Sequence, residues 1–135
     1  MSEEIPNAVQ FAMPLPDPLL SLNKRLHHMA RARHTKRQRL DAYLVAVDAR
    51  HRNVWSLGGD VCWDEERVRV DVEIRPRKGM KRHDDTAIWE AMKPIFDGLE
   101  DAGWVADDKQ LVVGELTWAK ERTAEILLTL TALPR

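Results

Sequence analysis

The segment that most constrains the fold runs from Arg67 to Arg75, where charged and mainly β-branched residues alternate strictly (RVRVDVEIR). Successive side chains of a strand point to opposite faces of a sheet, so this alternation predicts a strand with one apolar face and one charged face. The apolar face consists of Val68, Val70, Val72 and Ile74. The sequence therefore predicts a sheet that is covered on one side only.

Three other segments are typical of strands. Val9–Met13 is a short apolar run that leads into a proline-rich loop, Leu111–Val113 opens a second strand, and Glu125–Leu130 forms the last one. Residues Ala119–Arg122 are expected to form the turn between the last two strands. Trp55–Trp63 contains two adjacent glycines, and we expect a turn or hairpin there.

A first helix is predicted to begin at Thr35, because Thr35-Lys36-Arg37-Gln38 has the form of a capping box. Lys36, Arg37 and Arg39 lie in the first turn of this predicted helix. Cations there oppose the helix dipole, at a cost of at most about 1 kcal/mol that a phosphate contact would offset. Apolar residues follow at i, i+3, i+4 and i+7, and they predict the buried stripe of this helix: Leu40, Tyr43, Leu44 and Val47.

A second helix is predicted between Asp85 and Gly103, which stands where a C-terminal cap is expected. Pro94 lies inside this segment, so we expect either a kink or a helix start near Lys93. The polar stripe of the helix carries Thr86, Glu90, Lys93 and Asp97. Its core stripe consists of Ile88, Ala91, Met92, Ile95, Leu99 and Ala102.

The order strand, helix, strand, helix, strand, strand predicts an α/β (α+β) fold, in which about four strands of a mixed sheet pack with two main helices. A length of 135 residues with 44% hydrophobic residues favours one domain over residues 1–135. The sequence has no membrane-length apolar run and no signal-peptide pattern at its start, so we expect a cytoplasmic protein. Its single cysteine, Cys62, excludes an intramolecular disulfide and a cysteine zinc cage, and is expected to be a buried core thiol.

Two acidic pairs flank the second helix: Asp84-Asp85 before it and Asp107-Asp108 after it. Four carboxylates brought together would repel one another unless a cation or shared protons offset their charge. Mg²⁺ prefers oxygen ligands and activates water for phosphodiester hydrolysis, and Lys93 would stabilise charge on the phosphate. The alternatives are that the first pair only caps the helix and that the second is only a turn.

Positive charge is concentrated in the first part of the chain. Residues 1–82 hold 16 Lys and Arg against 11 Asp and Glu, whereas residues 83–135 hold 5 against 11. The segments Lys24–Arg39 and Arg75–Arg82 are basic and contain no Asp or Glu. Such clusters suit a polyanion such as nucleic acid, although an ordinary solvated face is the alternative.

Several short motifs resemble the RusA-type Holliday-junction resolvases, especially a divergent phage and actinobacterial branch. Leu20–His27 is similar to the family's "LSLN.R.H" segment. The match covers nearly the whole chain. The residues that resemble the family signature "K…DGL.DAG…DD" are Lys93-Pro94, Asp97-Gly98-Leu99, Asp101-Ala102-Gly103 and Asp107-Asp108.

The resemblance implies a homodimeric nuclease in the cytoplasm of a bacterium or a phage-infected host cell, which cuts four-way DNA junctions with Mg²⁺ or Mn²⁺. The family's first acidic motif, Asp-x-Asp-Asn, begins at Asp84 in this alignment. Its second Asp falls on Thr86 and its Asn on Ala87, while Asp85 lies one residue away. A family branch with Asp-Pro-Ala-Asn departs from the motif in a similar way.

We therefore expect a metal-dependent, structure-selective endonuclease acting on branched DNA. The alternatives are a binder of branched or duplex DNA whose metal site has decayed, and an adaptor domain with no nucleic-acid role. The expected catalytic residues are Asp84, Asp85, Lys93, Asp107 and Asp108, with Asp84, Asp85 and Asp108 as metal ligands. The expected DNA-binding residues are Asn23, Lys24, Arg25, His28, Arg31, Arg33, Lys36, Arg37, Lys78, Lys81 and Arg82.

Overall fold

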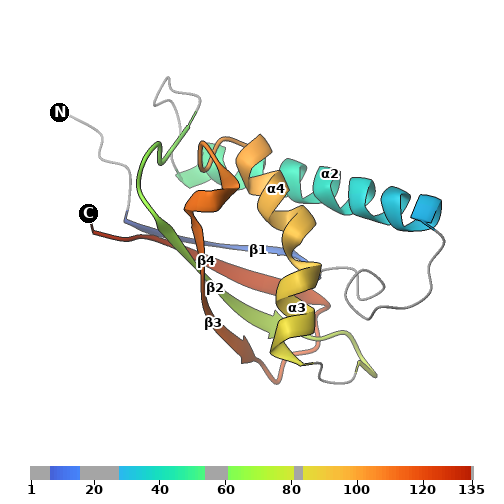
Figure 1. Ribbon diagram of the computed structural model, residues 1–135. Coiled ribbons are helices and arrows are strands. Elements are labelled where there is room, and N and C mark those ends of the chain that lie inside the picture. The colour runs from blue at the N-terminus through green and yellow to red at the C-terminus, as the bar shows by residue number, and fades with distance from the viewer. Residues whose placement is uncertain (1–6, 16–27, 54–60, 81–83, 135) are drawn as a thin grey trace.

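The computed structural model describes residues 7–15, 28–53, 61–80 and 84–134 (Figure 1). The predicted order of strands and helices is confirmed, and the fold is a single α+β domain. Its elements are β1 (Ala8–Pro14), α2 (His28–Asn53), β2 (Val68–Arg75), α3 (Asp85–Ala91), α4 (Lys93–Asp101), the 3₁₀ turn η1 (Asp108–Gln110), β3 (Leu111–Trp118) and β4 (Glu125–Ala132).

The four strands form one mixed sheet, as predicted, and the structure gives their order as β1-β4-β2-β3. β4 runs antiparallel to both β1 and β2, whereas β2 and β3 are parallel. The segment that joins β3 to β4 therefore passes over the end of β2. The apolar face predicted for β2 is buried, as its alternation indicated. Its residues are all at most 1% exposed: Val68, Val70, Val72 and Ile74.

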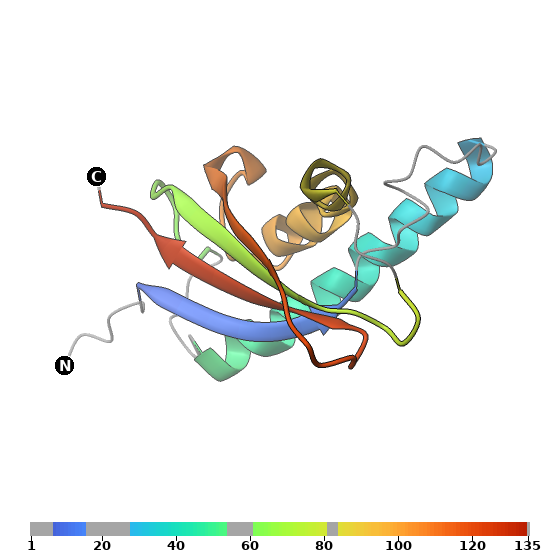
Figure 2. The same cartoon turned by 90° about the horizontal axis from the view of Figure 1, so that it is seen from below.

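Only one face of the sheet is deeply buried, and the helices lie on that side. Every second residue of β1 and β2, and of β4 as far as Leu130, is buried, and the residues between them are exposed or half-buried. Figure 2 shows α2 passing behind β1, and Figure 1 shows α3 and α4 almost end to end, with α4 crossing α2. None of the helices that the structure describes is long and apolar enough to cross a membrane.

Trp104 is the centre of the core. It is fully buried, its ring stacks on Phe11 of β1 at 5.6 Å, and its indole N–H donates a hydrogen bond of 2.9 Å to the carbonyl of Ala46 in α2. The ring also lies 5.7 Å from that of Trp63.

Cys62 is buried as predicted, and burial raises the pKa of its thiol.

α2 begins at His28, so the predicted start at Thr35 is wrong. A capping box needs a non-helical first residue, whereas Thr35 lies inside a continuous helix. The residues before it include Ala30, Ala32 and Arg33, which are good helix formers and allow the helix to continue toward the N-terminus.

The predicted stripe of α2 is only partly buried, because Tyr43 and Val47 pack against the core but Leu40 and Leu44 do not. Leu40 and Leu44 are 54% and 56% exposed, whereas the buried face of the helix is lined by Ala42, Ala46 and Ala49. α2 lies so close to α4 that Gly98 leaves room only for the small side chain of Ala42. The pattern of large apolar residues therefore indicated the buried face only in part.

The second predicted helix is divided in two by Pro94. α3 ends at Ala91, and α4 begins at Lys93 with the proline in its first turn, where the missing backbone N–H costs nothing. Gly103 follows α4 with a φ of 84°, which confirms the predicted cap. The turn predicted in Trp55–Trp63 lies mostly outside the described residues, and Trp63 itself pairs with Val105 in an isolated bridge.

Replacing Gly98 tests the close packing of α2 and α4. A Cβ at this position would lie 2.7 Å from the Cβ of Ala42 and 3.0 Å from the carbonyl oxygen of Arg39. We expect Gly98→Ala to lower the free energy of unfolding by about 1–3 kcal/mol in urea titrations. Adding Ala42→Gly should recover part of the loss, because it removes the nearest atom.

In a helix without this contact, Gly→Ala would raise the free energy of unfolding by about 0.5–1 kcal/mol. An increase of that size in Gly98→Ala would contradict the close packing.

Candidate metal centre

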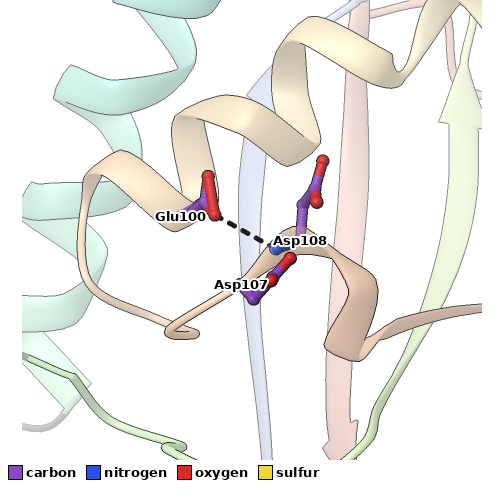
Figure 3. Close-up of side chains that lie close together, drawn as sticks. All are labelled: Glu100, Asp107 and Asp108. Atoms are coloured by element: carbon purple, nitrogen blue, oxygen red, sulfur yellow. Dashed lines mark hydrogen bonds between the residues drawn. The ribbon is translucent and has the colours of Figure 1, made fainter.

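Three carboxylates meet where the end of α4 faces η1. One ligand oxygen from each of Glu100, Asp107 and Asp108 lies within 4.8 Å of the other two. Figure 3 shows the two aspartates rising from the turn beside the glutamate of α4. Glu100 and Asp108 are half-buried and Asp107 is exposed. This group contains the second acidic pair predicted from the sequence and adds a residue that the prediction missed.

Backbone contacts hold the turn in place. The N–H of Asp108 donates to Oε1 of Glu100 at 3.2 Å, and the carboxylate of Asp107 accepts the N–H of Lys109 at 2.9 Å. Asp107 therefore caps η1 as well as belonging to the acidic group. The turn alternative considered for this pair is correct and does not conflict with its place in the group.

Gln110 fixes the turn to the rest of the protein. Its side-chain oxygen accepts the N–H groups of Ala106 and Asp107 at 2.8 and 2.9 Å. Its amide donates to the carbonyls of Trp63 and Glu66 at 3.0 and 2.9 Å. The spacing Asp107-x-x-Gln110 is a capping box, so the sequence contained a signal for this residue that the prediction did not use.

Lys93 lies beside the group, from the start of α4. Its ammonium is 3.1 Å from Oδ2 of Asp108 and 3.5 Å from Oδ1 of Asp97. The hydrogen bond to Asp108 is the main cause that raises the pKa of Lys93, and the same bond lowers the pKa of Asp108. The predicted association of Lys93 with the second acidic pair thus has a direct contact behind it.

The remaining carboxylates of α4 are paired with α2. Arg39 makes a two-bond contact with Asp101, at 2.6 and 2.8 Å, and its guanidinium lies 3.8 Å from Asp97. The hydrogen bond from Arg39 lowers the pKa of Asp101. Among the described residues, no Lys or Arg forms an ion pair with Glu100 or Asp107, and these two carboxylates carry the charge that is not offset.

Asp84 and Asp85 do not belong to this group. Asp84 caps α3 by accepting the N–H of Thr86 at 3.3 Å, and Asp85 is the exposed first residue of that helix. The seven residues of α3 then span about 10 Å before α4 begins at Lys93. The cap alternative is thus correct for Asp84, and metal binding by the first pair stays a prediction.

The predicted DNA-binding residues have different positions. Arg33, Lys36 and Arg37 are exposed on α2, and Lys78 is exposed in the turn after β2. His28 and Arg31 lie within α2, in its first turn. Asn23, Lys24, Arg25, Lys81 and Arg82 lie outside the described residues.

Glu100 was missed because the polar stripe of the second helix was ended at Asp97. One more step of three residues along that stripe reaches Glu100, so the helical period contained the signal. What the period could not give is the position of Asp107 and Asp108 beside it, which depends on how the chain turns after Gly103.

Comparisons with known proteins do not add a relative to this description. No protein-family model matches the chain, and a search of curated proteins finds no match.

Removing the ammonium at position 93 tests the electrostatics of the site. We expect Lys93→Met to raise the pKa of Asp108, measured by NMR titration of the side-chain carboxyl in a metal-free buffer. In the wild type, the pKa of Asp108 is lower in the folded protein than in the unfolded protein. The ionised carboxylate therefore stabilises the fold at pH values above its unfolded pKa of about 3.9. This stabilisation is lost as the pH falls through the folded pKa. The variant should therefore lose less stability on acidification.

Lys109→Met is the matched control, because it removes the same charge from the neighbouring residue while leaving the contact between Lys93 and Asp108 intact. Equal titration curves for Asp108 in the wild type and in Lys93→Met would show that the ion pair does not form in solution.

Proposed function

We propose that the protein is a metal-dependent, structure-selective DNA endonuclease that cleaves branched DNA such as Holliday junctions. The resemblance to RusA-type resolvases suggests this substrate. The observation that carries the proposal is the group of Glu100, Asp107 and Asp108 with Lys93 at its edge. We further propose that the protein acts as a homodimer in the cytoplasm of a bacterium or a phage-infected host cell.

The residues of the group fit Mg²⁺ or Mn²⁺. All available ligands are carboxylate oxygens, which hard divalent cations prefer. Two oxygens bound to one Mg²⁺ lie about 3–4 Å apart, so oxygens within 4.8 Å of one another need only small side-chain rotations to share an ion. The unpaired charge of Glu100 and Asp107 favours a cation at this position.

A divalent ion bound there would activate water and stabilise charge on the oxygens of the scissile phosphate. Asp108 is held ionised by Lys93, so it is ready to act as a ligand at neutral pH. Lys93 is 68% exposed at its side chain and can leave Asp108 to contact a phosphate of the incoming strand. In this mechanism Gln110 positions the turn and does not touch the substrate.

Exposed basic residues supply a surface for the DNA backbone. Arg33, Lys36 and Arg37 lie on α2, and Lys78 lies in the turn after β2. Contacts of this kind recognise phosphates without reading sequence, which suits an enzyme selective for DNA shape. A twofold homodimer would present the same surface twice, as a four-armed junction requires.

A DNA-binding protein that does not cleave is the second candidate. Asp84 and Asp85 stand apart from the acidic group, and Lys93 already offsets the charge of Asp108. Both observations are compatible with a site that no longer holds a metal ion. Such a protein would bind junctions in a salt-dependent manner and leave them intact.

A cleavage assay on a synthetic four-way junction separates the two candidates. We expect the wild type to nick the junction with Mg²⁺ or Mn²⁺ and to be inactive with EDTA. Asp108→Asn should lower the nicking rate by about 10²-fold or more, because it removes a charged metal ligand at nearly constant shape. Junction binding by this variant, measured by fluorescence anisotropy, should stay close to that of the wild type.

Asp48→Asn is the matched control, since Asp48 is exposed on α2 and pairs only with Arg52 among the described residues. It should nick at the wild-type rate. Junction binding without nicking by the wild type would favour the second candidate, and full activity of Asp108→Asn would rule out the proposed metal centre.

A further inference from the structure

A cavity of about 740 Å³ lies on another part of the surface, between α2, the end of β1 and the chain that follows β2. Its floor is apolar and is formed by Met13, Ala42 and Ile95, all at most 2% exposed. None of the three carboxylates of the candidate metal centre lines it. Its volume is in the range of sites that hold one small molecule or one nucleotide.

The sheet register explains why distant segments meet at this cavity. Pro14 at the end of β1 and Arg75 at the end of β2 both pair with Glu125, the first residue of β4. The two strands therefore end at the same level of the sheet. The residues that leave them, Leu15 and Arg77, both line the cavity.

The rim of the cavity carries two guanidinium groups from separate elements. Arg37 comes from α2 and Arg77 from the segment after β2. In the part of the chain that the structure describes, neither side chain forms an ion pair, whereas Arg39 and Arg75 are both paired with carboxylates. Two guanidiniums that are not neutralised, above an apolar floor, suit a ligand with a phosphate group and a flat apolar body.

The same rim also carries an acceptor. Asp41 lies one turn after Arg37 on α2, and Gln38 stands between them. A carboxylate repels a phosphate but accepts hydrogen bonds from the amino group of a base. The side-chain amide of Gln38 already donates to the carbonyl of Ala91 at 3.5 Å. The cavity thus combines donors for a phosphate with an acceptor for the edge of a base.

We propose that this cavity holds one unpaired nucleotide of a DNA strand, with its phosphate between Arg37 and Arg77 and its base on the apolar floor. The base edge faces Asp41, so adenine and cytosine, which carry an exocyclic amino group, are preferred over thymine. This inference rests on the proposed function for its substrate. It adds a reason for selectivity, because a branch point can release a base from its stack at little cost.

The first test measures nucleotide binding to the full chain by isothermal titration calorimetry, in a buffer that contains EDTA. We expect dAMP and dCMP to bind more tightly than dTMP, and more tightly than deoxyadenosine, which lacks the phosphate. Arg37→Ala combined with Arg77→Ala should weaken dAMP binding about tenfold or more, because two charge-assisted contacts are lost.

The matched control combines Arg52→Ala with Arg67→Ala, which removes the same charge from two exposed arginines that do not line the cavity. It should bind dAMP like the wild type. Equal losses in the two double variants would indicate general electrostatics and overturn the site. Inorganic phosphate that binds as tightly as dAMP would show a simple anion site and overturn the nucleotide assignment.

The second test uses a four-way junction with 2-aminopurine, which fluoresces when unstacked, at the branch point. We expect the fluorescence of this junction to rise when the Asp108→Asn variant binds it. The rise should be absent when the variant also carries Arg37→Ala and Arg77→Ala, at protein concentrations that saturate the junction. A junction nicked by the wild type without any rise would overturn the cavity inference and leave the nuclease intact. A fluorescence rise without nicking by the wild type would support the cavity inference and overturn the proposed nuclease activity.

Discussion

The close contact between α2 and α4 is the constraint on which the rest of the structure depends. Gly98 of α4 leaves room only for the small side chain of Ala42, and the Arg39–Asp101 pair joins the two helices at the surface beside it. This contact fixes which side of α4 faces α2. The side that carries Lys93 and Glu100 is then left to face η1.

Charge pairing divides the acidic second half of the chain into separate sets. Arg39 offsets the charge of Asp101 and lies near Asp97, while Lys93 offsets that of Asp108. Glu100 and Asp107 have no such partner among the described residues. A stretch that is uniformly acidic in sequence is therefore uneven in space, and Glu100 and Asp107 leave charge without an ion-pair partner at the turn before β3.

Local signals in the sequence predicted most of the backbone. The alternation of β2, the break at Pro94 and the cap at Gly103 each depend on neighbouring residues only, and each prediction is confirmed. The stripe of α2 was only partly right, because helix periodicity identifies faces but does not say which face is buried. Leu40 and Leu44 are exposed, whereas the position of α2 that faces Gly98 of α4 has room only for Ala42.

For the candidate site, the sequence by itself determined the residue types, the acidic pair at Asp107-Asp108 and the position of Lys93 on a polar helix face. Only the tertiary structure decided which carboxylates meet, because this depends on the turn after α4 and on the anchoring of Gln110 to Trp63 and Glu66. It placed Glu100 beside the pair and left Asp84 at the far end of α3. Spacing along a chain limits which residues can meet, but packing of distant segments selects those that do.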